Sequence, residues 1–73
     1  MANENYTGKI TGENLRRLLK ENNMTQQSFA DDYGLELRTV SRWINEEKLT
    51  NIMDIQALAD YFDVSFTDFF RAI

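Results

Sequence analysis

The 73-residue sequence predicts an all-α domain of five short helices. Apolar residues recur at intervals of three and four, which is the helical period, and no segment alternates between apolar and polar residues as a strand would. Proline is absent, and so is cysteine, so no disulfide supports the core. A chain of this length forms one domain with a small core. The expected helices cover about residues 12–22, 25–33, 36–46, 51–62 and 65–71.

The start of the chain differs in character from the rest. Residues 1–10 are polar, and we expect them to form a flexible segment ahead of a domain that spans residues 11–73. Thr11 is the expected N-cap of the first helix. Asparagine tolerates the left-handed conformation, so Asn22 and Asn23 suit its end. The core face of this helix holds Leu15, Leu18 and Leu19.

The second and third helices are separated by only a few residues, so they must cross steeply. Thr25 is the expected N-cap of the second helix, and Gly34 is expected to end it with a positive φ. Ala30 is small where the two helices approach each other. An abrupt helix–turn–helix with glycine at the turn is a recurring DNA-binding device. The residues expected to share the core beneath the bend are Phe29, Val40, Trp43 and Ile44.

The last two helices complete the domain. Asn51 is expected to start the fourth helix, whose inner face is Ile52, Ile55, Leu58, Ala59 and Phe62. Ser65 and Asp68 resemble a capping box for the fifth helix, and Phe69 is expected to face the core. Two interpretations stay open for the remaining apolar residues of this helix: a dimer interface or a part of the domain's own core. These residues are Phe66, Phe70 and Ile73.

Composition argues against several classes of function. Without histidine or cysteine the chain lacks the usual acid–base residue at neutral pH, the commonest metal ligand and any thiolate, so we expect no catalytic residue, metal or cofactor. No apolar run could span a membrane and the start does not resemble a signal peptide, so we expect a cytoplasmic protein. No small-molecule ligand is evident. The net charge of −4 argues against a nucleic-acid partner. However, residues 1–45 hold six basic and six acidic side chains, so the acidic excess lies entirely in residues 46–73.

The bent pair and its surroundings resemble the helix-turn-helix domain of the phage repressor and Cro type, also called the XRE family. The resemblance covers about residues 12–70. It rests on Thr25-Gln26, Phe29-Ala30, Gly34, Val40 and Ser41-Arg42-Trp43. It implies a five-helix, lambda-repressor-like fold. The sequence departs from the family where a buried ion pair is common, because the two positions are Leu19 and Ile44, and we expect an apolar contact there.

The resemblance also implies DNA contacts. Arg38 and Arg42 are the expected base readers, because arginine can donate two hydrogen bonds to guanine. Leu37 could contact a thymine methyl or belong to the core. Glu36 could accept a hydrogen bond from cytosine, or its negative charge could simply stabilise the positive N-terminal end of the helix. The expected phosphate contacts are Gln26, Thr25, Gln27, Thr39, Asn45 and Lys48, with one of Arg16, Arg17 and Lys20 as a further candidate. Each could instead be a solvated surface residue.

These observations predict a DNA-binding transcription regulator of the phage repressor type. Its helix 36–46 would lie in the major groove of a duplex operator, and two copies would bind as a homodimer. The alternative is a protein-interaction module of the antitoxin or antirepressor type, which keeps the fold with weak or no DNA binding. The acidic total, Leu37 and the pair Glu46-Glu47 favour this alternative.

Overall fold

A computed structural model describes residues 4–72 of the chain. It contains four α-helices and one short 3₁₀ helix, and no strand occurs among these residues. The all-α fold is therefore confirmed, although the last of the five predicted helices is a single 3₁₀ segment. The elements are α1 (Glu4–Glu21), α2 (Gln26–Tyr33), α3 (Leu37–Asn45), α4 (Ile52–Phe62) and η1 (Phe66–Phe70).

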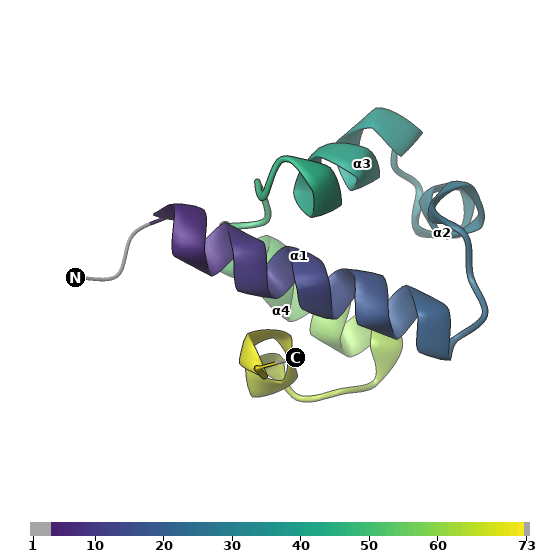
Figure 1. The fold of residues 1–73 in the computed structure, drawn as a ribbon. Helices are drawn as coiled ribbons and strands as arrows, with labels where there is room; N and C mark the ends of the chain where they lie inside the picture. The colour runs from purple at the N-terminus through teal and green to yellow at the C-terminus, as the bar shows by residue number, and fades with distance from the viewer. Residues whose placement is uncertain (1–3, 73) are drawn as a thin grey trace.

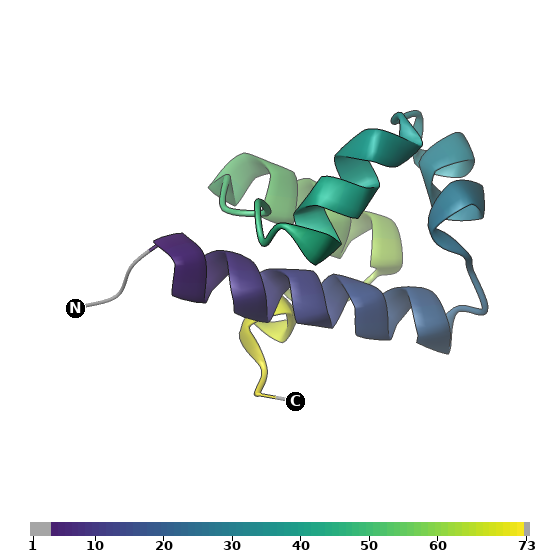
Figure 2. The same ribbon diagram turned by 45° about the horizontal axis from the view of Figure 1, so that its top comes forward.

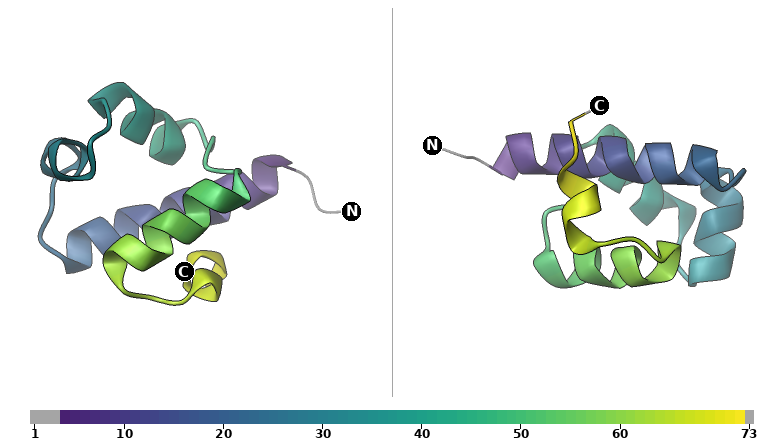
Figure 3. Two further views of the ribbon diagram at one scale, coloured as in Figure 1. Left: turned by 180° about the vertical axis from the view of Figure 1, so that it is seen from behind. Right: turned by 90° about the horizontal axis from the view of Figure 1, so that it is seen from below.

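Helix α1 is the longest element, and the others are arranged around it. Figure 1 and Figure 2 show α3 on one side of α1 and the yellow η1 segment on the opposite side. Helix α2 joins the far end of α1 to α3. The views from behind and below in Figure 3 show α4 running beneath α1, between α3 and η1. This arrangement leaves one long side of α3 away from all other helices.

The first helix begins at Glu4 rather than at about residue 12, so the prediction for its start was wrong. Residues 4–10, expected to belong to a flexible segment, are its first turns, and residues 1–3 lie outside the described residues. Thr11 is no N-cap. It is fully buried within α1, and its hydroxyl donates to the carbonyl oxygen of Leu49 at 2.6 Å and is also within hydrogen-bonding distance of the Thr7 carbonyl at 2.9 Å.

Two glycines let α1 pass close to the last turn of α3 and to the chain that follows it. A Cβ at Gly8 would lie 1.8 Å from the carbonyl oxygen of Glu47, and one at Gly12 would lie 2.8 Å from the carbonyl oxygen of Trp43. Neither position has room for a side chain. Glycine is unfavourable inside a helix, but here Gly12 allows a close contact with α3 and Gly8 allows one with the segment after it.

The core is one cluster of side chains from all five elements. Leu19 and Ile44 are both buried in it, as expected for the pair that replaces a buried ion pair. Trp43 was expected inside, but it is only half-buried and packs against the edge of the cluster. The buried members are Leu15, Leu18, Leu19, Phe29, Ala30, Val40, Ile44, Leu49, Ile55, Leu58, Ala59 and Phe69.

Helix α4 begins where the sequence predicts. The Asn51 side chain accepts hydrogen bonds from the backbone N–H groups of Met53 and Asp54, at 2.8 and 3.2 Å, which confirms the cap. The prediction for Ile52 was wrong: it is 63% exposed, because the first turn of α4 extends beyond the core, and Phe62 is half-buried.

Segment η1 is tied to α1 by a buried amide. The side-chain amide of Asn14 donates to the carbonyl oxygens of Phe69 and Arg71, each at 2.9 Å. The expected capping box is absent, since the Ser65 hydroxyl makes no cap hydrogen bond and lies 3.1 Å from the Thr67 hydroxyl. The Asp68 carboxylate instead pairs with Arg17 and Arg71. Phe66 and Phe70 are half-buried against the core, which favours the intradomain interpretation, and Ile73 lies outside the described residues.

Candidate nucleic-acid interface

The bend between α2 and α3 begins with a well-defined helix start. The backbone N–H of Ser28 donates to the Thr25 hydroxyl at 3.0 Å, and the backbone N–H of Thr25 donates to the Ser28 hydroxyl at 2.9 Å. This reciprocal pair is a capping box, and it confirms Thr25 as the N-cap. The first turn of α2 is therefore fixed in place.

Gly34 makes the turn possible. Its φ is 90°, in the left-handed region that glycine adopts without strain, as the sequence predicted. The N–H groups of Gly34 and Leu35 both donate to the carbonyl oxygen of Ala30 at 2.9 Å. Because Ala30 is fully buried and small, α2 and α3 can cross closely there.

Helix α3 has a buried side and an exposed side. Val40 and Ile44 are buried, whereas Arg38 and Arg42 are exposed and lie one turn apart on the other side. Leu37 is 41% exposed, so it is a surface residue rather than a core residue. The exposed side of α3 thus carries two guanidinium groups with one apolar side chain beside them.

The charges next to these arginines differ. Arg42 Nε lies 3.7 Å from Glu46 Oε1, and both side chains are more than half exposed, so this pair is weak and exchangeable. Arg38 forms no ion pair with any side chain of residues 7–72. Glu36 precedes α3 at the N-cap position, but its side chain makes no cap hydrogen bond.

The predicted phosphate contacts lie at both ends of the bent pair. Gln26 is half-buried at the start of α2, and the Gln27 side chain donates to Asp31 at 2.9 Å. Thr39 is half-buried, and Lys48 is exposed in the segment after α3. These residues belong to α2, α3 and the segment after α3, and their contacts with DNA remain predictions.

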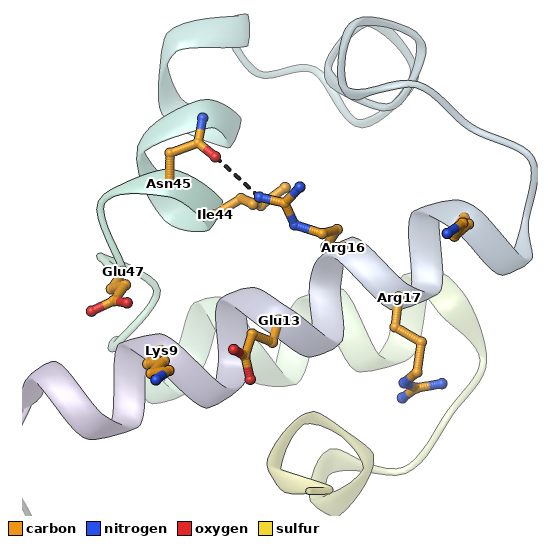
Figure 4. A pocket seen from close by; sticks show the side chains of 8 residues that line it. Lys9, Glu13, Arg16, Arg17, Ile44, Asn45 and Glu47 are labelled. Carbon is orange, nitrogen blue, oxygen red and sulfur yellow. Dashed lines mark hydrogen bonds between the residues drawn. The ribbon is translucent and has the colours of Figure 1, made fainter. Parts of the chain in front are cut away.

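One connection between α1 and α3 was not expected from the sequence. The Arg16 guanidinium donates to the Asn45 side-chain oxygen at 3.2 Å (Figure 4). The Asn45 amide group donates to the Ser41 hydroxyl at 3.0 Å. Lys9, which belongs to the segment expected to be flexible, lies on the same side of α1. The spacing of Lys9, Arg16 and Lys20 at seven and four residues indicates that all three lie on one side of a helix, and it could have placed Lys9 on α1.

Arg17, in contrast, has a structural role. It pairs with Glu21 at 3.1 Å and with Asp68 at 3.4 Å, and its Nε donates to the Asn14 side-chain oxygen at 3.1 Å. In Figure 4 its side chain points toward η1, away from α3. Of the three helix-one cations considered, Arg17 is thus the one committed to holding the domain together.

An aromatic cluster supports α2 from behind. The Phe29 ring lies 5.2 Å from the Tyr33 ring and 5.4 Å from the Tyr61 ring, measured between centroids. The Tyr61 hydroxyl donates to the Asp32 carboxylate, and this bond raises the pKa of Tyr61 to about 12, with burial adding to the shift. Burial raises the pKa of Tyr33, with a smaller effect from acidic residues of α4. These contacts fix the orientation of α2 against α4.

Residues 4–72 contain neither a metal-binding cluster nor a membrane-spanning helix. Among residues 4–72 there is no group of histidine, cysteine or carboxylate side chains that could hold a metal ion. No helix in this part of the chain is long and apolar enough to cross a membrane.

A close pair of helices with an alanine at the crossing, a left-handed glycine at the turn and arginines on the exposed side of the second helix defines a helix-turn-helix domain. The chain belongs to the Cro/C1-type helix-turn-helix DNA-binding domains, whose family model matches residues 14–73. The resemblance expected from the sequence is confirmed. No curated protein and no solved structure matches the chain significantly. Membership in this family supports a DNA-binding transcription regulator, and such domains are typically not enzymes.

Proposed function

We propose that the chain binds duplex DNA sequence-specifically as a transcriptional repressor of the phage type, with α3 in the major groove. The observation that carries the proposal is the pair Arg38 and Arg42, exposed on the side of α3 opposite the buried Val40 and Ile44. A helix whose exposed side carries two arginines and lacks covering elements can enter the groove without rearrangement. Repression follows if the occupied site overlaps a promoter.

The two arginines read guanine. Each guanidinium can donate to guanine O6 and N7, a contact that contributes roughly 1–3 kcal/mol of discrimination against other bases. Glu46 lies beside Nε of Arg42, which leaves the two terminal nitrogens of that side chain free for a base. Leu37 is exposed and could contact a thymine methyl, and Glu36 could accept a hydrogen bond from cytosine.

Phosphate contacts fix the position of α3 on the duplex. Gln26 and the capped start of α2 would hold a phosphate on one side of the groove, with Thr25 and Gln27 beside them. Thr39, Asn45 and Lys48 would contact the backbone at the other side. Such contacts set register and carry no sequence information by themselves.

Two copies would provide the affinity that one domain lacks. A single module of this size buries only about 600–1,000 Å² of its surface on DNA. A homodimer would bind half-sites about one helical turn apart. Phe66 and Phe70 remain the candidate dimer contacts, although their half-burial against the core reduces the apolar surface they offer. Sedimentation of the chain alone and on DNA would measure the stoichiometry.

The test is a selection experiment followed by direct binding. Duplexes are selected from a random pool with the wild-type chain, and fluorescence anisotropy then compares wild type with the double variant Arg38→Ala, Arg42→Ala. We expect the double variant to lose discrimination between the selected duplex and a scrambled one. Arg71→Ala, a substitution on the η1 side of α1, is the matched control and should discriminate as wild type does. Full discrimination by the double variant would refute the assignment of α3 as the reading helix.

The second candidate is a protein-interaction module that has kept the fold without DNA binding. Its specific support is the exposed apolar pair at the start of α4: Ile52 is 63% exposed and Met53 is 80% exposed. A chemical-shift titration separates the two functions. DNA should perturb residues 25–48, whereas a protein partner should perturb α4 and η1.

A further inference from the structure

Two surface hollows meet on the side of α1 that faces α3. The first, of about 660 Å³, lies between α1 and the C-terminal end of α3. The second, of about 280 Å³, reaches the start of α2. Arg16 and Lys20 line both, Asn45 lines only the first, and Gln26 lines only the second. We call Arg16 and Lys20, with Asn45 and Gln26 at either end, the α1 strip.

The α1 strip has positive charge that no nearby carboxylate neutralises. Neither Arg16 nor Lys20 forms an ion pair with any side chain of residues 7–72, whereas Arg17, Arg42 and Arg71 all do. Arg16 and Lys20 lie one helical turn apart on the same side of α1, and both are exposed. In a chain with a net charge of −4, these are two adjacent cations without an ion-pair partner among the described side chains.

The rest of the larger hollow has a different character. Glu13 and Glu47 line it together with Lys9, and Figure 4 shows Glu47 near Lys9, with Glu13 between Lys9 and Arg16 along α1. Their two carboxylates would repel a phosphate there. The anion-binding part of the surface is therefore the half that contains Arg16 and Lys20.

Arg16 is also held in a defined position. Its guanidinium donates to the Asn45 oxygen at 3.2 Å, and the Asn45 amide group donates in turn to Ser41 at 3.0 Å. This chain of hydrogen bonds fixes the Asn45 amide and leaves most of the Arg16 donors free. It also holds Arg16 beside Asn45, the last residue of α3, which lies two helical turns after Arg38.

We propose that the α1 strip binds a backbone phosphate of the DNA duplex and so extends the protein–DNA interface onto α1. The inference rests on the proposed function. The strip joins two residues predicted to contact phosphates, Gln26 at the start of α2 and Asn45 at the end of α3, and supplies the unpaired cations between them. A guanidinium beside an ammonium group is a suitable pair of donors for a phosphate oxygen. The contact is independent of sequence, because it reads the backbone only.

The experiment measures binding of Arg16→Gln and Lys20→Gln to the duplex selected by the wild-type chain and to a scrambled duplex, between about 50 and 200 mM salt. Each lost phosphate contact should lower the slope of log K against log salt by about 0.9, which makes the loss of affinity over this range about 3.5-fold smaller than for wild type. Both duplexes should be affected equally. Arg16→Lys keeps the charge and should restore the wild-type slope.

Arg71→Gln is the matched control, since it removes one positive charge on the opposite side of α1. Thermal unfolding checks that all variants fold. If the α1 variants keep the slope and affinity of Arg71→Gln while the Arg38 and Arg42 double variant loses discrimination, the inference is overturned and the proposed function stands. If the wild-type chain binds neither duplex, the proposed function fails and the inference fails with it.

Discussion

Replacing Gly8 by alanine tests how the start of α1 is packed. Gly8 is fully buried where α1 passes the chain that follows α3. An alanine Cβ would lie 1.8 Å from the carbonyl oxygen of Glu47 and 2.7 Å from its carbonyl carbon. Both atoms belong to the backbone, so the contact cannot be relieved by rotating a side chain. Helix α1 or the segment after α3 must move.

Two effects of opposite sign decide the outcome. Alanine is favoured over glycine within a helix by about 1 kcal/mol. Overpacking a tight contact costs about 1–3 kcal/mol, and separation of α1 from the segment would also break the bond between Thr11 and Leu49, a net loss of about 1 kcal/mol. The clash should therefore outweigh the propensity, with a net loss of about 1–3 kcal/mol in the free energy of unfolding. For a domain of this size, 1 kcal/mol lowers Tm by about 4–8 °C.

The assay is thermal unfolding followed by circular dichroism. Gly12→Ala is the control, because its Cβ would approach backbone at 2.8 Å and the smaller overlap should cost less. We expect Tm to fall in the order wild type, Gly12→Ala, Gly8→Ala. A Gly8→Ala chain more stable than wild type would show that propensity alone acts at residue 8, and that residues 4–10 do not pack on the domain as described.

Three further substitutions test the supports of the fold. Asn14→Ala should lower the midpoint of urea unfolding, because it removes the donor to buried carbonyl groups. Each carbonyl left without a donor costs about 1–3 kcal/mol of stability. Thr25→Ala removes the capping box with Ser28 and should lower the stability by about 1 kcal/mol. Asp32→Asn should lower the pKa of Tyr61 from about 12 toward its ordinary value, measured by phenolate absorbance. Because folding raises this pKa, the stabilisation is complete below about pH 10 and is lost as the pH rises through about 12.

Each of these predictions has a contrary outcome. An unchanged urea midpoint for Asn14→Ala would mean that η1 is not anchored by this amide. Equal melting of Thr25→Ala and wild type would mean that the start of α2 is held by packing alone. Asp31→Asn is the control for Asp32→Asn, and a similar fall in the Tyr61 pKa in both would indicate general charge rather than the hydrogen bond.

The sequence predicts the elements whose signals are local. Thr25, Gly34 and Asn51 act on backbone groups within a few residues, so α2, the turn and the start of α4 follow from neighbouring letters alone. The start of α1 cannot be predicted from neighbouring residues in this way. Gly8 and Gly12 break helices in isolation, and only the distant backbone of residues 43–47 explains why glycine is needed inside a helix.

The candidate interface shows the same division. The spacing of Arg38 and Arg42 against Val40 predicts an exposed side of α3, because helical periodicity is a local property. The link from Arg16 through Asn45 to Ser41 joins residues 29 apart at its longest step, and no pattern in the sequence indicates it. The exposure of Ile52 likewise depends on where the core ends, which hydrophobicity alone does not reveal.

Methylation interference at guanine N7 tests most directly whether α3 reads the major groove. Duplex selected by the wild-type chain is partly methylated at N7, bound, and separated into bound and free fractions. Methylation of the contacted guanines should exclude DNA from the bound fraction, and Arg38→Ala and Arg42→Ala should each remove interference at a different guanine. If methylation at no guanine N7 reduces binding by the wild-type chain, the arginines of α3 do not contact guanine in the major groove, and the assignment of α3 as the reading helix is wrong.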